Sequence, residues 1–116
     1  MDNLLALHCQ RPQKGEMLTP EQIRTLRVQI PAWELIEKNQ IPQLERVFRF
    51  KNFAQALAFT NRVGALAEAE DHHPAILTEW GRVTVTFWTH FVKGLHLNDF
   101  IAAAKTDQLY EAAEKG

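Results

Sequence analysis

The segment from Arg82 to His90 constrains the fold most, because its polar and apolar residues alternate from Arg82 to Phe87. Val83, Val85 and Phe87 would point to one side of an extended chain, and the residues between them to the other. Successive side chains of a β-strand face opposite sides of its sheet, so this period of two predicts a strand with one buried face. His90 then ends the strand on its more polar face.

Three further extended segments accompany this strand. Residues 75–80 precede it, and Gly81 between the two segments predicts a hairpin. Residues 33–50 mix apolar and charged side chains around a polar stretch at residues 39–43. We interpret this stretch as the turn of another antiparallel hairpin, although its alternation is imperfect.

Apolar residues at spacings of three and four predict three helices. The first runs from Thr19, a capping residue, to Pro31, which ends it. The second begins at Asn52, and its apolar stripe comprises Ala56, Phe59, Val63 and Leu66. The third begins near Leu97, after a loop over residues 91–96, and frays after Tyr110.

The order helix, two strands, helix, two strands, helix predicts an α+β domain. In this fold a four-stranded antiparallel sheet carries all three helices on one face. A chain of 116 residues suits one domain. We expect this domain over residues 19–116, after an irregular N-terminal arm over residues 1–18. The uncovered sheet face would line a site or meet a second subunit.

The composition excludes several classes of binding partner for such a domain. Lys and Arg number 13 against 14 Asp and Glu, a net charge of −1, so no broad positive field would attract nucleic acid or anionic lipid. A single cysteine, Cys9, offers neither an internal disulfide nor a thiolate pair for structural zinc. The apolar run at residues 4–7 is too short for a signal peptide, and no stretch could span a bilayer. We therefore expect a cytoplasmic protein with no membrane partner and no direct nucleic-acid partner.

The chemically distinctive residues lie where the second helix should end. His72 and His73 follow several carboxylates, and Pro74 blocks further helix. Imidazole titrates near neutral pH, so histidines can donate and accept protons under physiological conditions. With His90 at the end of the next hairpin, proton transfer is the first functional hypothesis.

The spacing of these residues resembles the signature of pterin-4a-carbinolamine dehydratases, also called 4a-hydroxytetrahydrobiopterin dehydratases. The matching positions are Glu68, His72, His73, Pro74, Trp80, His90 and Asp99. Flanking landmarks at Trp33, residues 48–50, residues 52–53, Thr89 and residues 94–95 also match. The resemblance covers about residues 19–109.

This resemblance implies a reaction, the dehydration of a 4a-hydroxytetrahydropterin to a quinonoid dihydropterin. It would recycle the cofactor of aromatic amino acid hydroxylases, which suggests a functional link to such an enzyme. A protonated imidazole would turn the leaving hydroxide into water, and a neutral base would take the N5 proton. Neither a cofactor nor a metal is required. The resemblance also implies the same α+β architecture, and a homodimer or homotetramer formed through the sheet.

The same resemblance assigns roles to individual residues. His72 and His90 correspond to the acid or base catalysts, and His73 to the histidine that holds the pterin. Asp71 and Thr89 belong to the segments that line the pocket with these histidines. The carboxylates that orient the imidazoles correspond to Glu68 and Asp99.

Four aromatic or histidine positions call for separate comment. Trp88 and Phe91 occupy positions that are often polar in the family, which predicts a narrower and more apolar pocket rim. His96 takes the place of the serine or threonine that would cap the third helix. We interpret Trp80 as a packing residue.

Three alternatives remain open from the sequence. The three histidines could bind zinc, although they lack a familiar short metal spacing. The acidic residues at the helix end, Glu70 above all, could be a solvated surface. The chain could also be a non-catalytic partner, because relatives serve as dimerisation cofactors of a homeodomain transcription factor or assist enzyme assembly. The natural pterin and the choice between dimer and tetramer are not fixed.

Overall fold

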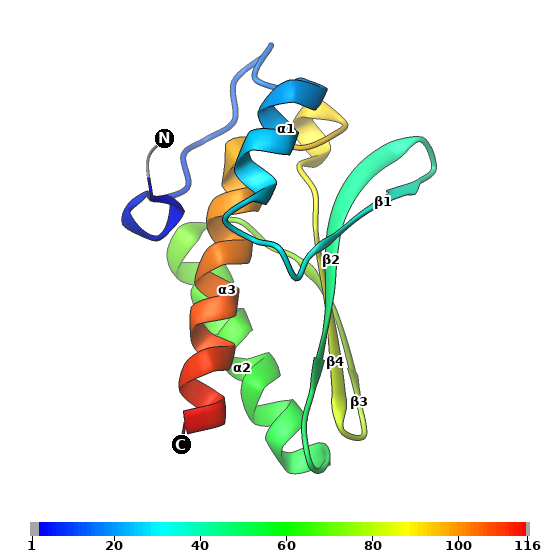
Figure 1. Cartoon of the computed structure of the whole chain (residues 1–116), viewed down its shortest axis with the longest axis vertical. Helices are drawn as coiled ribbons and strands as arrows, with labels where there is room; N and C mark the ends of the chain where they lie inside the picture. The colour runs from blue at the N-terminus through cyan, green and yellow to red at the C-terminus, as the bar shows by residue number, and fades with distance from the viewer. Residues whose placement is uncertain (1–2, 116) are drawn as a thin grey trace.

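The computed structural model describes residues 3–113 in full and the backbone of residues 114 and 115. Its elements are the short 3-10 helix η1 (Leu4–Ala6), α1 (Pro20–Arg27), β1 (Glu34–Lys38), β2 (Ile41–Arg49), α2 (Phe53–Glu70), β3 (Ala75–Glu79), β4 (Arg82–Phe87), the 3-10 helix η2 (His90–Val92) and α3 (Leu97–Lys115). The helices form one layer beside a single sheet (Figure 1). The predicted α+β fold and its element order are confirmed.

The sheet joins the two hairpins through their second strands. Its order is β1-β2-β4-β3, and all neighbours are antiparallel. In the central pair Leu44 lies opposite Phe87, and Phe48 lies opposite Val83. These four side chains are at most 1% exposed, because they face the helical layer. The hydrophobic effect therefore fixes the register, since a shift of one residue would expose them all.

Aromatic rings fill the space between the sheet and the helices. The Trp33 ring lies 5.9 Å from Phe48 and 5.7 Å from Phe87, and Phe48 lies 4.8 Å from Phe59 of α2. The indole nitrogen of Trp33 donates a hydrogen bond to Asp107 at 2.7 Å, so its polar atom is satisfied. This cluster attaches both long helices to the central strands.

Some helices and strands begin or end at other residues than predicted. Asn39 and Gln40 have φ values of 53° and 66°, which make a tight two-residue turn, so β2 begins at Ile41. Helix α1 ends at Arg27, before Pro31, and α3 continues past Tyr110 to Lys115. Within residues 3–115, no helix is both long and apolar enough to cross a membrane.

The N-terminal arm is fastened to the helices by two buried side chains. Glu70 accepts the N–H of Cys9 at 2.7 Å, and its carboxylate also contacts Lys105 at 3.1 Å. The amide of Asn98 pairs with both backbone groups of Gln10, at 2.9 and 2.6 Å. The Glu70 side chain is 8% exposed, so its interpretation as a solvated helix end is wrong.

Candidate active site

The end of α2 turns two adjacent histidines in different directions. Asp71 has the left-handed values φ 51° and ψ 43°. Its N–H bonds to the carbonyl of Glu68 at 3.4 Å, and the N–H of His72 bonds to the carbonyl of Ala67 at 3.1 Å. This pair of bonds is the Schellman ending of a helix. After it His72 is 9% exposed, whereas His73 is exposed to solvent.

A buried carboxylate holds His72. Asp99, in the first turn of α3, has no exposed surface, and its Oδ1 lies 2.6 Å from His72 Nε2. Its Oδ2 accepts the hydroxyl of Thr89 at 2.7 Å and the backbone N–H of His96 at 2.9 Å. Because Nε2–H donates to the carboxylate, Nδ1 is the nitrogen of His72 left for other partners. On one side the ring stacks on Phe87, 6.0 Å away with an interplanar angle of 11°.

His96 caps α3 in place of a serine or threonine. Its Nδ1 accepts the N–H of Asn98 at 3.0 Å, while Asp99 accepts the N–H of His96. This pair resembles a capping box, except that the imidazole accepts the N–H of the second helical residue rather than the third. Nε2 then carries the hydrogen and donates to Glu16 at 3.1 Å. That hydrogen bond lowers the pKa of the Glu16 carboxyl. The cap fixes the helix turn that carries Asp99.

His73 and Glu68 form a second imidazole–carboxylate pair on the surface. His73 Nε2 is hydrogen-bonded to Glu68 Oε2, and their side chains are 54% and 77% exposed. Asp71 is exposed between the two pairs, and its side chain forms no hydrogen bond within residues 3–113. The exposed pair is open to a ligand, whereas in the other pair Asp99 is fully buried and His72 keeps a small exposed surface.

His90 lies in η2 rather than at the end of a strand. β4 ends at Phe87, and Thr89 forms an isolated bridge with Gly94, whose carbonyl accepts the Thr89 N–H at 2.9 Å. At this point the Thr89 hydroxyl donates its hydrogen bond to Asp99. The predicted extension of the strand to His90 is therefore wrong. The His90 side chain is exposed and forms no hydrogen bond within residues 3–113.

The structure thus joins some of the predicted residues and leaves others at the surface. Hydrogen bonds connect His72, Asp99 and Thr89, so the end of α2, the segment leading to His90 and the start of α3 meet at one carboxylate. Phe87, which stacks on His72, was not among the predicted site residues. Its place in the alternating strand indicated burial, but nothing local indicated a histidine stacked on it. Within the described residues, no group of three or more His, Cys, Asp or Glu is placed to hold a metal ion.

Two aromatic residues near these segments are exposed. Trp80, at the β3–β4 turn, is 74% exposed, so its interpretation as a packing residue is wrong. Phe91 is 65% exposed and lines a cavity of about 390 Å³ with Arg11, Pro12 and Gln13 of the arm. The arm therefore adjoins the turn that carries His90.

Comparison with known proteins places this chain in a family. A protein of Nitrosococcus oceani is 56% identical over 111 residues, which cover 94% of this chain and 97% of its own length. One of Syntrophotalea carbinolica is 54% identical over 112 residues, which cover 96% and 100%. Both are named "Putative pterin-4-alpha-carbinolamine dehydratase".

Two solved structures resemble the fold. A transcriptional coactivator/pterin dehydratase from Brucella melitensis aligns with a TM-score of 0.73 and 28% identity, over 81% of this chain and 98% of its own. A pterin dehydratase-like protein, described as a RuBisCO assembly factor in the alpha-carboxysome, aligns with a TM-score of 0.54 and 27% identity, over 66% and 92%. The family model described as pterin 4 alpha carbinolamine dehydratase matches residues 16–109. Because this match spans most of the sequence, the chain belongs to the pterin-4-alpha-carbinolamine dehydratase family.

Proposed function

We propose that the protein dehydrates a 4a-hydroxytetrahydropterin, such as 4a-hydroxytetrahydrobiopterin, to the quinonoid dihydropterin. The observation that carries this proposal is the buried hydrogen-bonded group of His72, Asp99 and Thr89. Thr89 is the residue directly before His90 in the sequence, so the second proposed catalyst adjoins this group. A carboxylate that accepts a ring N–H fixes both the tautomer and the orientation of the imidazole. Such pre-organisation suits a residue that must transfer a proton at a defined atom.

The reaction needs one acid and one base. The C4a–O bond breaks, and a protonated imidazole supplies the proton that makes the departing hydroxide water. The N5–H bond breaks as the C4a=N5 double bond forms, and a neutral imidazole takes that proton. After both transfers the acid and base have exchanged protonation states, and solvent restores them. Each well-placed group of this kind contributes a factor of about 10² to 10⁴.

The two transfers are assigned to His72 and His90, and binding of the pterin ring to His73. Support for this division comes from their environments. His72 is oriented by Asp99, His90 is exposed, and His73 is held by Glu68 at the surface. Asp71 and Thr89 would complete the pocket beside these histidines. After a separate two-electron reduction to the tetrahydro form, the pterin would return to an aromatic amino acid hydroxylase in the cytoplasm.

A stopped-flow assay of the decay of 4a-hydroxypterin absorbance tests the assignment. We expect His72→Ala and His90→Ala each to lower the catalysed rate at least 100-fold, by the magnitudes typical of general acid–base groups. The control is His8→Ala, which removes an exposed histidine of the arm. Rates in the two site variants equal to that of His8→Ala would contradict the proposal.

A second function, a non-catalytic role in assembly, is favoured by one comparison. The aligned pterin dehydratase-like protein is described as a RuBisCO assembly factor. If this chain also acts through its surface, a tagged His72→Ala/His90→Ala double variant should still retain a stoichiometric partner, identifiable by mass spectrometry. Loss of the partner in the double variant would argue against this second role. Sedimentation of the purified chain separately tests the expected homodimer or homotetramer.

A further inference from the structure

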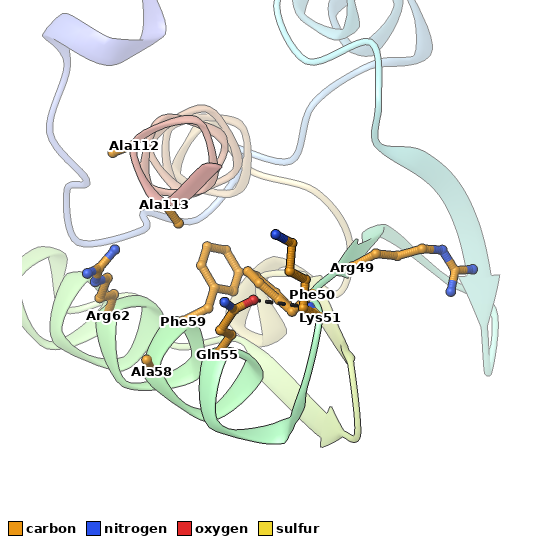
Figure 2. A pocket seen from close by; sticks show the side chains of 9 residues that line it. All are labelled: Arg49, Phe50, Lys51, Gln55, Ala58, Phe59, Arg62, Ala112 and Ala113. Carbon is orange, nitrogen blue, oxygen red and sulfur yellow. Dashed lines mark hydrogen bonds between the residues drawn. The ribbon is translucent and has the colours of Figure 1, made fainter. Parts of the chain in front are cut away.

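A second cavity lies toward the start of α2, away from the end that leads to His72. Its volume is about 790 Å³, within the range of roughly 300–1,000 Å³ that small-molecule sites occupy. The end of β2, the first half of α2 and the last turns of α3 enclose it (Figure 2). Its lining residues are Arg49, Phe50, Lys51, Gln55, Ala58, Phe59, Arg62, Ala112 and Ala113.

The charge of this cavity is one-sided. Three of its nine lining residues are basic and none is acidic, in a chain whose net charge is −1. Within the described residues, Arg49, Lys51 and Arg62 form no ion pair. By contrast, Arg46 pairs with Asp107 at 2.6 Å and Lys105 pairs with Glu70 at 3.1 Å. Cations left unpaired around a concave surface favour an anionic ligand.

Phe50, which is half-buried, forms the aromatic wall of the cavity, and behind it lies the core residue Phe59, which is 1% exposed. The centroids of Phe50 and Phe59 are 5.1 Å apart, with an interplanar angle of 40°. Lys51 lies at the Phe50 end of this pair and Arg62 beyond the Phe59 end, while Arg49 points away (Figure 2). Gln55 accepts the N–H of Lys51 at 3.1 Å, which ties the loop to α2. An aromatic ring laid on Phe50 would therefore have Lys51 beside it and Arg62 farther along α2.

We propose that this cavity binds a small aromatic phosphate of mononucleotide size. The half-buried Phe50 ring provides an apolar aromatic surface for a flat ring, and stacking of a base on an aromatic side chain is favourable for every base. Arg62 or Lys51 binds the phosphate through charge-assisted hydrogen bonds, which are stronger than neutral ones. The alanines of α2 and α3 leave the room that the ligand occupies. This site is separate from the histidine site and does not depend on the proposed dehydration.

Titration with three probes tests the ligand class. Adenosine monophosphate, adenosine and inorganic phosphate are each added to the full chain, and binding is followed by calorimetry and by NMR shifts of residues 50–62. We expect adenosine monophosphate to bind at least tenfold more tightly than either of the other two. Absence of binding at millimolar concentration, or equal binding of inorganic phosphate, would overturn the proposal.

Matched variants locate the site. Arg62→Gln and Lys51→Gln together should weaken adenosine monophosphate at least tenfold, whereas Arg24→Gln, on the exposed surface of α1, should not. Ala58→Leu would fill the cavity, while Ala54→Leu places the same side chain at an exposed position of α2 outside it. Leucine is a good helix former, so both variants should fold. Equal affinity in Ala58→Leu and Ala54→Leu would show that the nucleotide binds elsewhere.

Discussion

His72 Nε2 lies 2.6 Å from Asp99 Oδ1, although the two residues are 27 positions apart in the chain. One follows the last turn of α2, and the other belongs to the first turn of α3. The carboxylate that joins them also accepts the Thr89 hydroxyl and the His96 N–H. The residue that orients the candidate catalyst is thus also the residue that holds two helix ends and a strand end together.

Asp99→Asn should therefore lower stability as well as activity. An asparagine offers one acceptor oxygen and an NH₂ group that faces a donor, so at least one buried donor loses its partner. We expect a loss of roughly 2–4 kcal/mol in the free energy of unfolding, measured by urea denaturation. Asp71→Asn is the matched control, because Asp71 is exposed and asparagine tolerates its left-handed backbone. Equal stability of the two variants would contradict this account.

Glu70 should make stability depend on acid pH. Burial alone would raise the pKa of its carboxyl, but hydrogen bonds from Cys9, His8 and Lys105 outweigh that effect and lower the pKa from 4.5 to about 2. A carboxyl with a depressed pKa in the folded state stabilises the fold above its unfolded pKa. This contribution is lost as pH falls from about 4.5 through about 2. Glu70→Gln should therefore be less stable than wild type at pH 6, and the difference should shrink over that window in urea titrations. A difference that stays constant with pH would be contrary to expectation.

Because His96 caps α3, substitutions of His96 should lower the free energy of unfolding by different amounts. His96→Ala removes the acceptor of the Asn98 N–H and should cost about 1 kcal/mol or more, the magnitude typical of a lost cap. His96→Ser restores a capping oxygen and should recover part of this loss. Glu16→Gln, which changes only the outer partner of the ring, should have a smaller effect. Chemical denaturation of the three variants measures the order, and a serine variant no better than alanine would argue against the cap.

Two glycines should respond to alanine with opposite signs. Gly81 has φ +71°, and a Cβ there would lie 3.0 Å from the carbonyl of Phe50. Gly81→Ala should destabilise by roughly 1–2 kcal/mol, because left-handed backbone and crowding both oppose a side chain. Gly64, inside α2, has open space around its missing Cβ. Gly64→Ala should stabilise by about 0.5–1 kcal/mol. Thermal unfolding of the pair checks the signs.

The helices and strands could be predicted from local sequence patterns, because the buried residues of each element recur at the spacing typical of a helix or a strand. The alternation of Val83, Val85 and Phe87 matches the buried face of β4, and the stripe of Phe59 and Val63 matches the buried face of α2. In each case the residues that recur at the local spacing are the ones buried between the sheet and the helices. The element order then left an antiparallel sheet under helices as the simplest arrangement.

The site was harder to predict because distant partners determine its geometry. The alternating pattern predicted a strand as far as His90, whereas β4 ends at Phe87. Nothing near Thr89 in the sequence indicates that its hydroxyl binds Asp99. Glu70 resembled a surface residue because its partner Cys9 lies 61 positions away. His96 departs from the usual capping residues, yet its ring nitrogen has the acceptor geometry that a cap needs.

The central position of β2 and β4 in the sheet affects the order in which the protein folds. Each hairpin brings together neighbours in sequence, whereas Phe48 and Val83 meet across the whole of α2. Joining the hairpins must therefore close a long loop, a step whose entropic cost makes it slow. Pairing of β2 with β4 is therefore expected to be a slower step of refolding than the formation of either hairpin.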